Sequence, residues 1–360
     1  MNNKMSVYKP DWLEAKQRMT DWWAGKKVDR VVANVTAPKK ATDKLQYINK
    51  SPDKYIDVDT VFNNLDYQLN HTFWGGEAFP FHFIYLGPMF APLISYGAEP
   101  NFTEETTWYD PCFNSLDEII AYRPNLTNNK WWQLIFNIQK KSAERSHGSY
   151  LVQPVQTSDT IDTLAGLIGN EKILYAMADE PEKIKEARDI LWQCWVTIFH
   201  NDALDIMQSC NGGGNISLEV WAPGCLGTFQ CDLCVMISTD MFDEFIFSDL
   251  QTAYAQVDYG IYHLDGEGEI KHLDSLFKLE KLRMIQWVPS QRLNDPYYTD
   301  PLNWIDLIKR IQNTGRSVLL NTTYDRVKDL LNKIDRDLAY LVVNCPDVET
   351  AYQVLRDLEE

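Results

Sequence analysis

The sequence predicts an α/β fold, a (β/α)8 TIM barrel of eight parallel strands and their helices, with an irregular helical extension at the N-terminus. Three observations predict this class. Short, nearly continuous apolar runs alternate with amphipathic stretches, and such runs are typical of parallel strands buried on both faces. Eight of these runs can be counted. The sequence has no glycine-rich phosphate-binding fingerprint, which would favour an open nucleotide-binding sheet.

The eight expected strands are short runs rich in Val, Ile, Leu and aromatic residues. They are 31–36, 81–86, 150–155, 215–221, 259–264, 284–288, 317–321 and 340–344. Amphipathic stretches that predict helices lie at 181–208, 239–256, 301–314 and 323–334. The first of these begins at Pro181, a residue favoured in the first turn of a helix. This alternation of strands and helices indicates a parallel sheet.

The N-terminal part is less regular. We expect residues 1–75 to form a helical extension packed on the barrel, which spans 76–360, with both parts in one domain. Residues 11–24 predict a helix that carries three tryptophans and ends at Gly25. Residues 40–70 mix charged, amide and aromatic side chains and are expected to cap the barrel.

Charge and composition exclude several classes of protein. The 34 Lys and Arg against 51 Asp and Glu give a net charge of −17, so nucleic acid would be repelled and is not expected as a partner. No stretch approaches the roughly 20 apolar residues that span a bilayer, and no apolar signal core follows Met1. We therefore expect a cytoplasmic protein. The seven cysteines are odd in number and lack framework spacing, which indicates reduced thiols.

The ends of the expected strands carry candidate metal ligands, and barrel enzymes place their reactive groups there. His263 and Asp265 are two residues apart on one strand and can face the same side, and Cys345 follows the last strand. Imidazole, carboxylate and thiolate suit zinc, and three protein ligands would leave a fourth position open. A thiol bound there would lose its proton and become a nucleophile. The alternative is a histidine that only donates a hydrogen bond to a carboxylate.

Other candidates flank these strand ends. Asp232 and Gln286 are candidates for catalysis together with Asp265. Aromatic side chains near Gly or Pro suit the wall of a pocket, although packing in the core is the simpler alternative for any one of them. Candidates for contact with substrate or corrinoid are Trp74, Gln153, Trp221, Glu267, Trp287 and Asn321. Carboxylates such as Glu219 and Glu267 also leave a glycosidase open.

Two further motifs predict less. Cys231-Asp-Leu-Cys234 stands without a second cysteine pair or a histidine nearby in sequence, so incidental loop packing is expected rather than a zinc or redox site. Asp232 between these cysteines has helix entry as its structural alternative. Trp74-Gly75-Gly76 is expected in a loop, where the glycines serve a turn.

Several motifs along the chain carry a resemblance to a known family. They are Asp29-Arg-Val, Trp74-Gly-Gly-Glu-Ala-Phe-Pro, Asp162-Thr-Leu-Ala-Gly-Leu-Ile-Gly, Gln230-Cys-Asp, Met236-Ile-Ser-Thr-Asp-Met-Phe-Asp-Glu-Phe, His263-Leu-Asp-Gly, Ile285-Gln-Trp-Val-Pro and Cys345. With these motifs the chain resembles the uroporphyrinogen decarboxylase-like superfamily over most of its length. It is most similar to the branch of methylcobalamin:coenzyme M methyltransferases and trimethylamine-corrinoid-associated proteins.

The resemblance implies a (β/α)8 barrel and a zinc ion held by a His-x-Cys pair and a C-terminal Cys. His263 and Cys345 match two of these positions, whereas Asp265 stands where the family has Cys. Related cobalamin-independent enzymes supply an acid one strand later, where this chain has Gln286. The region 31–40 lacks the arginine cluster of the true decarboxylases, so decarboxylation is not expected.

The function implied is a zinc-dependent, corrinoid-linked methyltransferase. It would move a methyl group between a methylcorrinoid, presented by a partner corrinoid protein or bound transiently, and a small nucleophile such as a thiol. Two alternatives stay open: a metal-free hydrolase or lyase that uses pocket carboxylates, and a non-catalytic corrinoid- or sugar-binding barrel. A homodimer is also left open.

Overall fold

The computed structural model describes residues 4–40, 51–87, 89–155, 160–289 and 299–359. Its centre is a seven-stranded sheet with the order β2-β1-β13-β12-β11-β10-β9, in which every neighbouring pair is parallel except β1 and β2. The strands are β1 (Val32–Pro38), β2 (Thr72–Gly76), β9 (Leu226–Phe229), β10 (Tyr259–Asp265), β11 (Leu282–Val288), β12 (Ser317–Thr322) and β13 (Ala339–Asn344). The first 75 residues thus supply β1, which pairs with the last strand.

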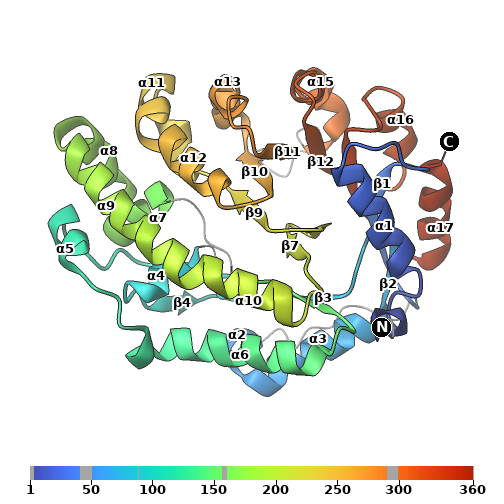
Figure 1. Ribbon diagram of the computed structural model, residues 1–360, viewed down its shortest axis with the longest axis horizontal. Coiled ribbons are helices and arrows are strands. Elements are labelled where there is room, and N and C mark those ends of the chain that lie inside the picture. The colour runs from blue at the N-terminus through green and yellow to red at the C-terminus, as the bar shows by residue number, and fades with distance from the viewer. Residues whose placement is uncertain (1–3, 41–50, 88, 156–159, 290–298, 360) are drawn as a thin grey trace.

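Three strand pairs lie outside this sheet. β3 (Phe81–His82) pairs in parallel with β6 (Leu151–Val152). Two antiparallel pairs are formed by β4 (Pro100–Phe102) with β5 (Thr107–Tyr109) and by β7 (Asn215–Ser217) with β8 (Val220–Ala222). Helices lie around the outside of the strands, as Figure 1 shows for α9, α10, α12 and α13. The fold is therefore mixed α/β with a mostly parallel central sheet.

Helices connect the strands. The α-helices are α1 (Trp12–Trp23), α2 (Asp53–Ile56), α3 (Val58–His71), α4 (Phe90–Ser95), α5 (Leu116–Ala121), α6 (Lys130–Ser146), α7 (Thr160–Ile168), α8 (Asn170–Asp179), α9 (Pro181–Cys194), α10 (Asn201–Ser209), α11 (Thr239–Phe242), α12 (Ser248–Ala255), α13 (Leu273–Leu276), α15 (Ile305–Gln312), α16 (Val327–Leu331) and α17 (Val348–Asp357). Shorter 3-10 turns are η1 (Lys4–Val7), η2 (Leu126–Asn128), η4 (Asp232–Met236), η6 (Glu267–His272) and η8 (Pro301–Trp304), and π-helical turns are η3 (Trp195–His200) and η5 (Asp243–Phe247). Among the described helices, none is long and apolar enough to cross a membrane.

Most predicted helices are confirmed. The stretch 181–208 is one continuous helical run through α9, η3 and α10, and Pro181 occupies its first turn as predicted. The stretches 239–256 and 301–314 are also helical, whereas 323–334 contains only the short α16.

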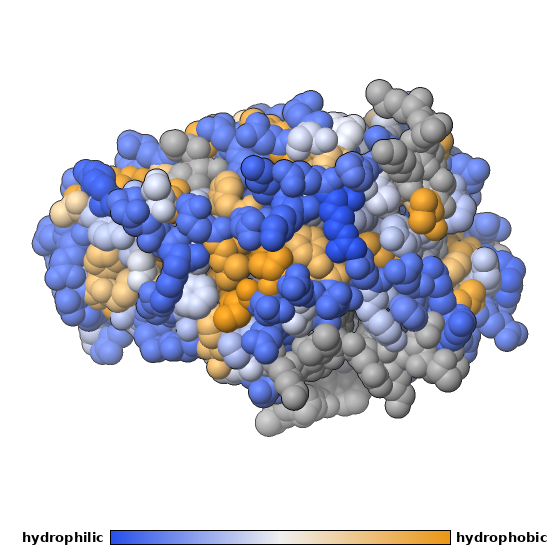
Figure 2. Space-filling model, turned by 90° about the horizontal axis from the view of Figure 1, so that it is seen from below, coloured by the Kyte–Doolittle hydropathy of each residue, from blue (hydrophilic) through white to orange (hydrophobic). Residues whose placement is uncertain are grey.

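Polar side chains dominate the face shown in Figure 2, with smaller apolar areas between them.

The predicted strand 215–221 is wrong. Leu218 and Glu219 have positive φ angles of 49° and 60°, which turn the chain back on itself and make a hairpin of β7 and β8. The parallel strand of the central sheet at this place is β9, which the sequence analysis missed because Gly227 and Thr228 interrupt its apolar pattern. The strands predicted at 81–86 and 150–155 shrink to two residues each.

The Trp74-Gly75-Gly76 motif, expected in a loop, lies in strand β2. Gly76 has φ +61°, and a side chain there would place its Cβ atom 2.2 Å from the carbonyl oxygen of Ala33. The two glycines therefore permit close antiparallel pairing with β1 rather than a free turn. The buried amino group of Lys9 donates to the carbonyl oxygens of Trp74 and Gly76, at 3.0 and 2.8 Å.

The strands separate two hydrophobic clusters. One lies between the sheet and the outer helices, and it includes Leu264, Trp287 and Leu341. The other lies on the opposite, inner face, where Trp12, Trp22 and Trp23 of α1 also pack. Its strand residues are Val32, Leu151, Leu226, Ile261, Met284, Leu319 and Tyr340, with Phe81 packed against it. Segments from β3 and β6 thus share one interior with the strands of the central sheet.

Candidate functional site

A polar layer follows the inner apolar cluster toward the carboxyl ends of the strands. Side chains alternate between the two faces of a strand, so the residue two positions after an inner residue is also inner. Applied to the inner cluster, this rule gives the apolar Val342 and six polar residues, which are called the polar layer below: Asn34, Gln153, Thr228, His263, Gln286 and Asn321. The registers agree, because His263 is the partner of Gln286 and Ile261 the partner of Thr228. The carboxyl end of the inner face is therefore the place for polar chemistry.

His263 is oriented by its neighbour on β11. Its Nδ1 atom lies 2.5 Å from Oε1 of Gln286. Because the amide oxygen only accepts hydrogen bonds, Nδ1 carries the proton in the neutral imidazole and Nε2 keeps a lone pair. Nε2 lies 4.0 Å from the Asp265 carboxylate, and the two side chains are 20% and 47% exposed. This arrangement leaves a nitrogen base open to solvent beside a negative charge.

Asp232 is the first residue of η4, three positions after the end of β9, and brings a second carboxyl group to this region. Gln230 donates to it at 3.1 Å. Partial burial, followed by the negative charges of Asp162 and Asp265, raises the pKa of Asp232 to about 7. Asp162 is held in place by the backbone N–H groups of Asp232 and Leu233, at 2.7 and 2.9 Å. Asp232 can therefore donate or accept a proton near neutral pH.

A cavity of about 410 Å³, which is within the usual size range of small-molecule sites, is lined by residues of α2, α3 and β3 and by Glu219 rather than by the polar layer itself. Its lining includes Tyr55, Phe83, His82 and Glu219. The backbone carbonyl of Glu219, at the tip of the β7–β8 hairpin, accepts hydrogen bonds from Asn34 at 2.5 Å and from Tyr340 at 3.2 Å. The hairpin tip therefore connects the cavity with the inner face. Of this lining, the sequence analysis had named only Glu219, because β3 and α3 carry no motif.

Cys345 lies apart from the other predicted metal ligands. It packs in the hydrophobic cluster between the sheet and the helices, and burial raises the pKa of its thiol to about 11. Five residues separate it from the inner-facing Tyr340, which assigns it to the outer face by strand alternation. Among the residues that the structure describes, no three His, Cys, Asp or Glu side chains are grouped so that they could hold a metal ion. The donor set present here does not fit the predicted three-ligand zinc site.

The three tryptophans predicted to receive substrate or corrinoid are buried. Trp221 packs edge-on against Trp12 in the inner cluster, and Trp287 packs against Trp304 on the outer side. Trp74 is also buried, in β2. All three tryptophans therefore pack in the core, which was the simpler alternative to a place in a pocket wall. The other predicted contacts lie nearer the site, with Gln153 buried in the polar layer, Asn321 exposed at the end of β12 and Glu267 half-buried at the start of η6.

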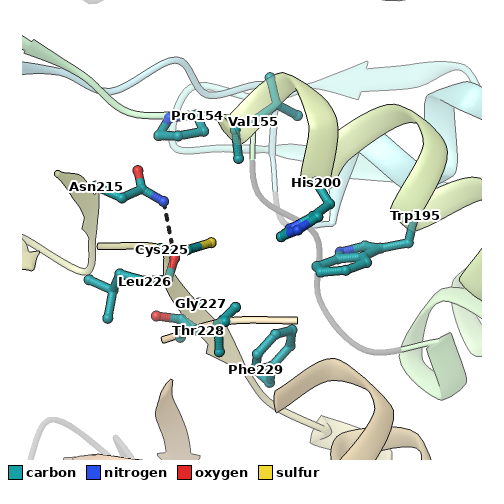
Figure 3. A pocket seen from close by; sticks show the side chains of 12 residues that line it. Pro154, Val155, Trp195, His200, Asn215, Cys225, Leu226, Gly227, Thr228 and Phe229 are labelled. Atoms are coloured by element: carbon teal, nitrogen blue, oxygen red, sulfur yellow. Dashed lines mark hydrogen bonds between the residues drawn. The ribbon is translucent and has the colours of Figure 1, made fainter. Parts of the chain in front are cut away.

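A second hollow lies between β6, η3 and β9 (Figure 3). Its walls include Trp195, His200 and Cys225, and Asn215 donates to the carbonyl oxygen of Leu226 beside it at 3.1 Å. The volume is about 40 Å³. This is about a tenth of the volume of the cavity that Tyr55, Phe83 and Glu219 line, so the hollow is the weaker candidate for a substrate site.

Comparison with protein-family models and with curated proteins finds no match to this chain. The likeness to the uroporphyrinogen decarboxylase-like superfamily therefore stays a prediction carried by the motifs, and the function is argued from the geometry of the polar layer.

Proposed function

We propose that the strands close into a (β/α)8 barrel and that the chain is an enzyme acting on a small molecule at the carboxyl end of its interior. The central sheet supplies six parallel strands, β1 and β9 to β13, and the parallel strands β3 and β6 bring the number to eight and add Phe81 and Leu151 to the same inner cluster. One interior shared by all these segments is the packing expected of a barrel, in which reactive groups sit at the carboxyl ends of the strands.

The reaction proposed is transfer of a methyl group to a small nucleophile such as a thiol. The nucleophile donates a hydrogen bond to Nε2 of His263, and its proton moves to that nitrogen. Its freed electron pair forms the new bond to the methyl carbon, while the old bond breaks and leaves its pair on the donor. Asp265, 4.0 Å away, stabilises the imidazolium that forms, and Gln286 keeps the Nδ1 proton in place.

The observation that carries this proposal is the orientation of His263 by Gln286, which leaves Nε2 as the open base. The methyl donor, a methylcorrinoid presented by a partner corrinoid protein, comes from the resemblance alone. A zinc ion is likewise implied by the resemblance alone, and none of the steps above requires it.

The test is incubation of the protein with methylcobalamin and a panel of small thiols, alcohols and amines, followed by the visible absorbance of the cobalt–methyl group. We expect loss of that absorbance with at least one nucleophile and appearance of its methylated product. Absence of transfer to every nucleophile, with and without added Zn²⁺, would overturn methyl transfer as the function.

The Asp232–Asp265 pair favours a second candidate, a hydrolase or lyase that works through carboxyl groups. A carboxyl group with a pKa near 7, raised in part by a neighbouring carboxylate, suits proton donation to a substrate. This enzyme would work without a methyl donor and with EDTA present. Its rate would fall as pH rises through about 7, because Asp232 loses the proton that it donates, and Asp232→Asn would abolish it. A rate that depends on His263 but not on Asp232 would exclude this candidate.

A further inference from the structure

A buried cluster behind Asp232 takes no part in the proposed reaction. It consists of Cys231, Cys234, Glu269 and His272, each at most 1% exposed. The N–H of Cys234 donates to the carbonyl oxygen of Cys231 at 3.2 Å and closes a turn. The outer Cα atoms of such a turn lie within about 7 Å, and a disulfide needs about 4.4–6.8 Å. We propose that Cys231 and Cys234, paired in this turn beside His272, form a redox-active dithiol that hydrogen peroxide oxidises to an intramolecular disulfide.

His272 supplies the neighbour that the CxxC motif lacked in the sequence. It comes from η6, 38 positions after Cys234 along the chain, and its Nε2 donates to the carbonyl oxygen of Cys234 at 2.9 Å. Its ring stacks on Phe242 with centroids 4.3 Å apart and planes 13° from parallel. Lys271, one residue earlier, donates to the carbonyl oxygens of Val235 and Ile237. These contacts hold the imidazole against the turn that carries the thiols.

The polar atoms around the pair favour a thiolate at Cys234. Hydrogen bonds from Cys231 and then from His272 lower the pKa of Cys234 to about 6. Burial of Cys234, and after it the negative charge of Asp162 on α7, oppose this shift. A thiolate, rather than a thiol, is the species that attacks peroxides.

Glu269 supplies a neutral acid next to the thiolate. Both of its carboxyl oxygens are buried, and neither has a hydrogen-bond partner among the residues that the structure describes. Burial, followed by the negative charge of Cys234, raises the pKa of Glu269 to about 11, with Asp232, Asp162 and Asp265 adding to the shift. The group therefore keeps its proton at neutral pH and can give it up when a stronger base forms beside it.

These groups account for every bond and proton in the oxidation of the two thiols by hydrogen peroxide. The Cys234 thiolate attacks one peroxide oxygen, the O–O bond breaks, and a sulfenic acid and hydroxide form. Glu269 protonates the hydroxide to water and recovers its proton from solvent. The sulfur of Cys231 then attacks the sulfenic sulfur, so that the S–S bond forms and the S–O bond breaks. The Cys231 proton leaves with the oxygen as a second water.

The test is a hydrogen peroxide titration of the intact protein, followed by mass spectrometry of the whole chain and of its peptides. We expect loss of two hydrogen atoms, a crosslink between Cys231 and Cys234, and recovery of both thiols with dithiothreitol. Cys225→Ser, which removes another buried thiol, should leave the crosslink unchanged. Oxidation of the exposed Cys112 with Cys231 and Cys234 still reduced would overturn the proposal.

The pH dependence of the crosslinking rate tests the role of His272 separately from formation of the disulfide. Crosslinking of the wild type should be near its full rate at pH 7 and fall below about pH 6, because the thiolate is then protonated. His272→Phe keeps an aromatic ring beside Phe242 but removes the hydrogen bond from His272, so the fall in its rate should lie at a higher pH than in the wild type. The same pH profile in both proteins would contradict the role of His272.

Discussion

Two carboxyl groups near the site have raised pKa values for different reasons, and this sets what each can do. Asp232 keeps contact with solvent, and its pKa of about 7 lets it exchange a proton in the physiological range. Glu269 is fully buried, and its pKa of about 11 keeps it a neutral acid. The first suits proton transfer with a substrate, and the second suits proton transfer with a buried neighbour only.

Glu269 should make the folded state less stable as pH rises. Its pKa is higher in the folded protein than in the unfolded chain, so between the two values the folded state holds one more proton. The free energy of unfolding then falls with pH by at most about 1.4 kcal/mol per unit. Glu269→Gln should remove this slope. Urea unfolding of both proteins at about pH 5 and pH 8 checks the difference, and equal slopes would show that Glu269 is ionised in the fold.

The strand alternation that places His263, Asp265 and Gln286 on one face could be predicted from the sequence, because it depends only on spacing along β10 and β11. The position of Cys345 could not. It follows the last strand, and its outward side is fixed by packing against the helices. His272 was missed because it meets Cys234 only through the fold of η6 against η4.

At the scale of elements, α1, β1 and β2 meet at the buried carboxylate of Glu77. Arg18 of α1 donates to it at 3.0 Å, and Arg30 donates to both of its oxygens at 2.7 and 3.0 Å. The backbone N–H of Ala33 in β1 adds a bond at 2.8 Å. The side chain of Glu77, the residue after β2, thus fixes α1 and β1 to each other.

Glu77→Ala should destabilise this junction strongly. The change leaves Arg30 largely buried without its partner, and removing one member of a buried ion pair costs about 3–5 kcal/mol. Chemical denaturation measures the loss. Asp117→Ala is the matched control, because its ion pair with Lys183 is exposed and worth at most about 1 kcal/mol. Similar losses in the two variants would contradict the structural role of Glu77.

The strands could likewise be predicted only in part from the sequence. The strands β1 and β10 to β13 were predictable because each is a nearly continuous apolar run. The β7–β8 hairpin was not, because its turn residues Leu218 and Glu219 are not typical of a tight turn, and the side chains of Asn34 and Tyr340 that donate to the backbone carbonyl of Glu219 are distant in sequence.

At the scale of the whole molecule, the interior is divided into an apolar layer covered by α1 and a polar layer that carries the site. Trp23 lies in α1, which covers the apolar layer, and its indole N–H donates to the carbonyl oxygen of Trp221 at 2.9 Å. The apolar packing and the polar side chains therefore lie toward opposite ends of the same strands.

Trp23→Ala should lower the free energy of unfolding by about 3–5 kcal/mol, because it leaves a large cavity in the apolar layer. Trp108→Ala removes the same side chain type from a position that is 58% exposed and should change stability by about 0.5 kcal/mol or less. Thermal and urea unfolding compare the two. Equal effects would show that α1 does not seal the interior.

The proposed methyl transfer depends above all on Nε2 of His263 as the catalytic base. The most direct measurement is the rate of methyl transfer from methylcobalamin to an accepted nucleophile for the wild type, His263→Gln and the control His71→Gln, a histidine of α3 outside the polar layer. We predict a loss of about 10²–10⁴-fold for His263→Gln, the usual contribution of a general base, and a wild-type rate for His71→Gln. A folded His263→Gln protein with the wild-type rate would contradict the account.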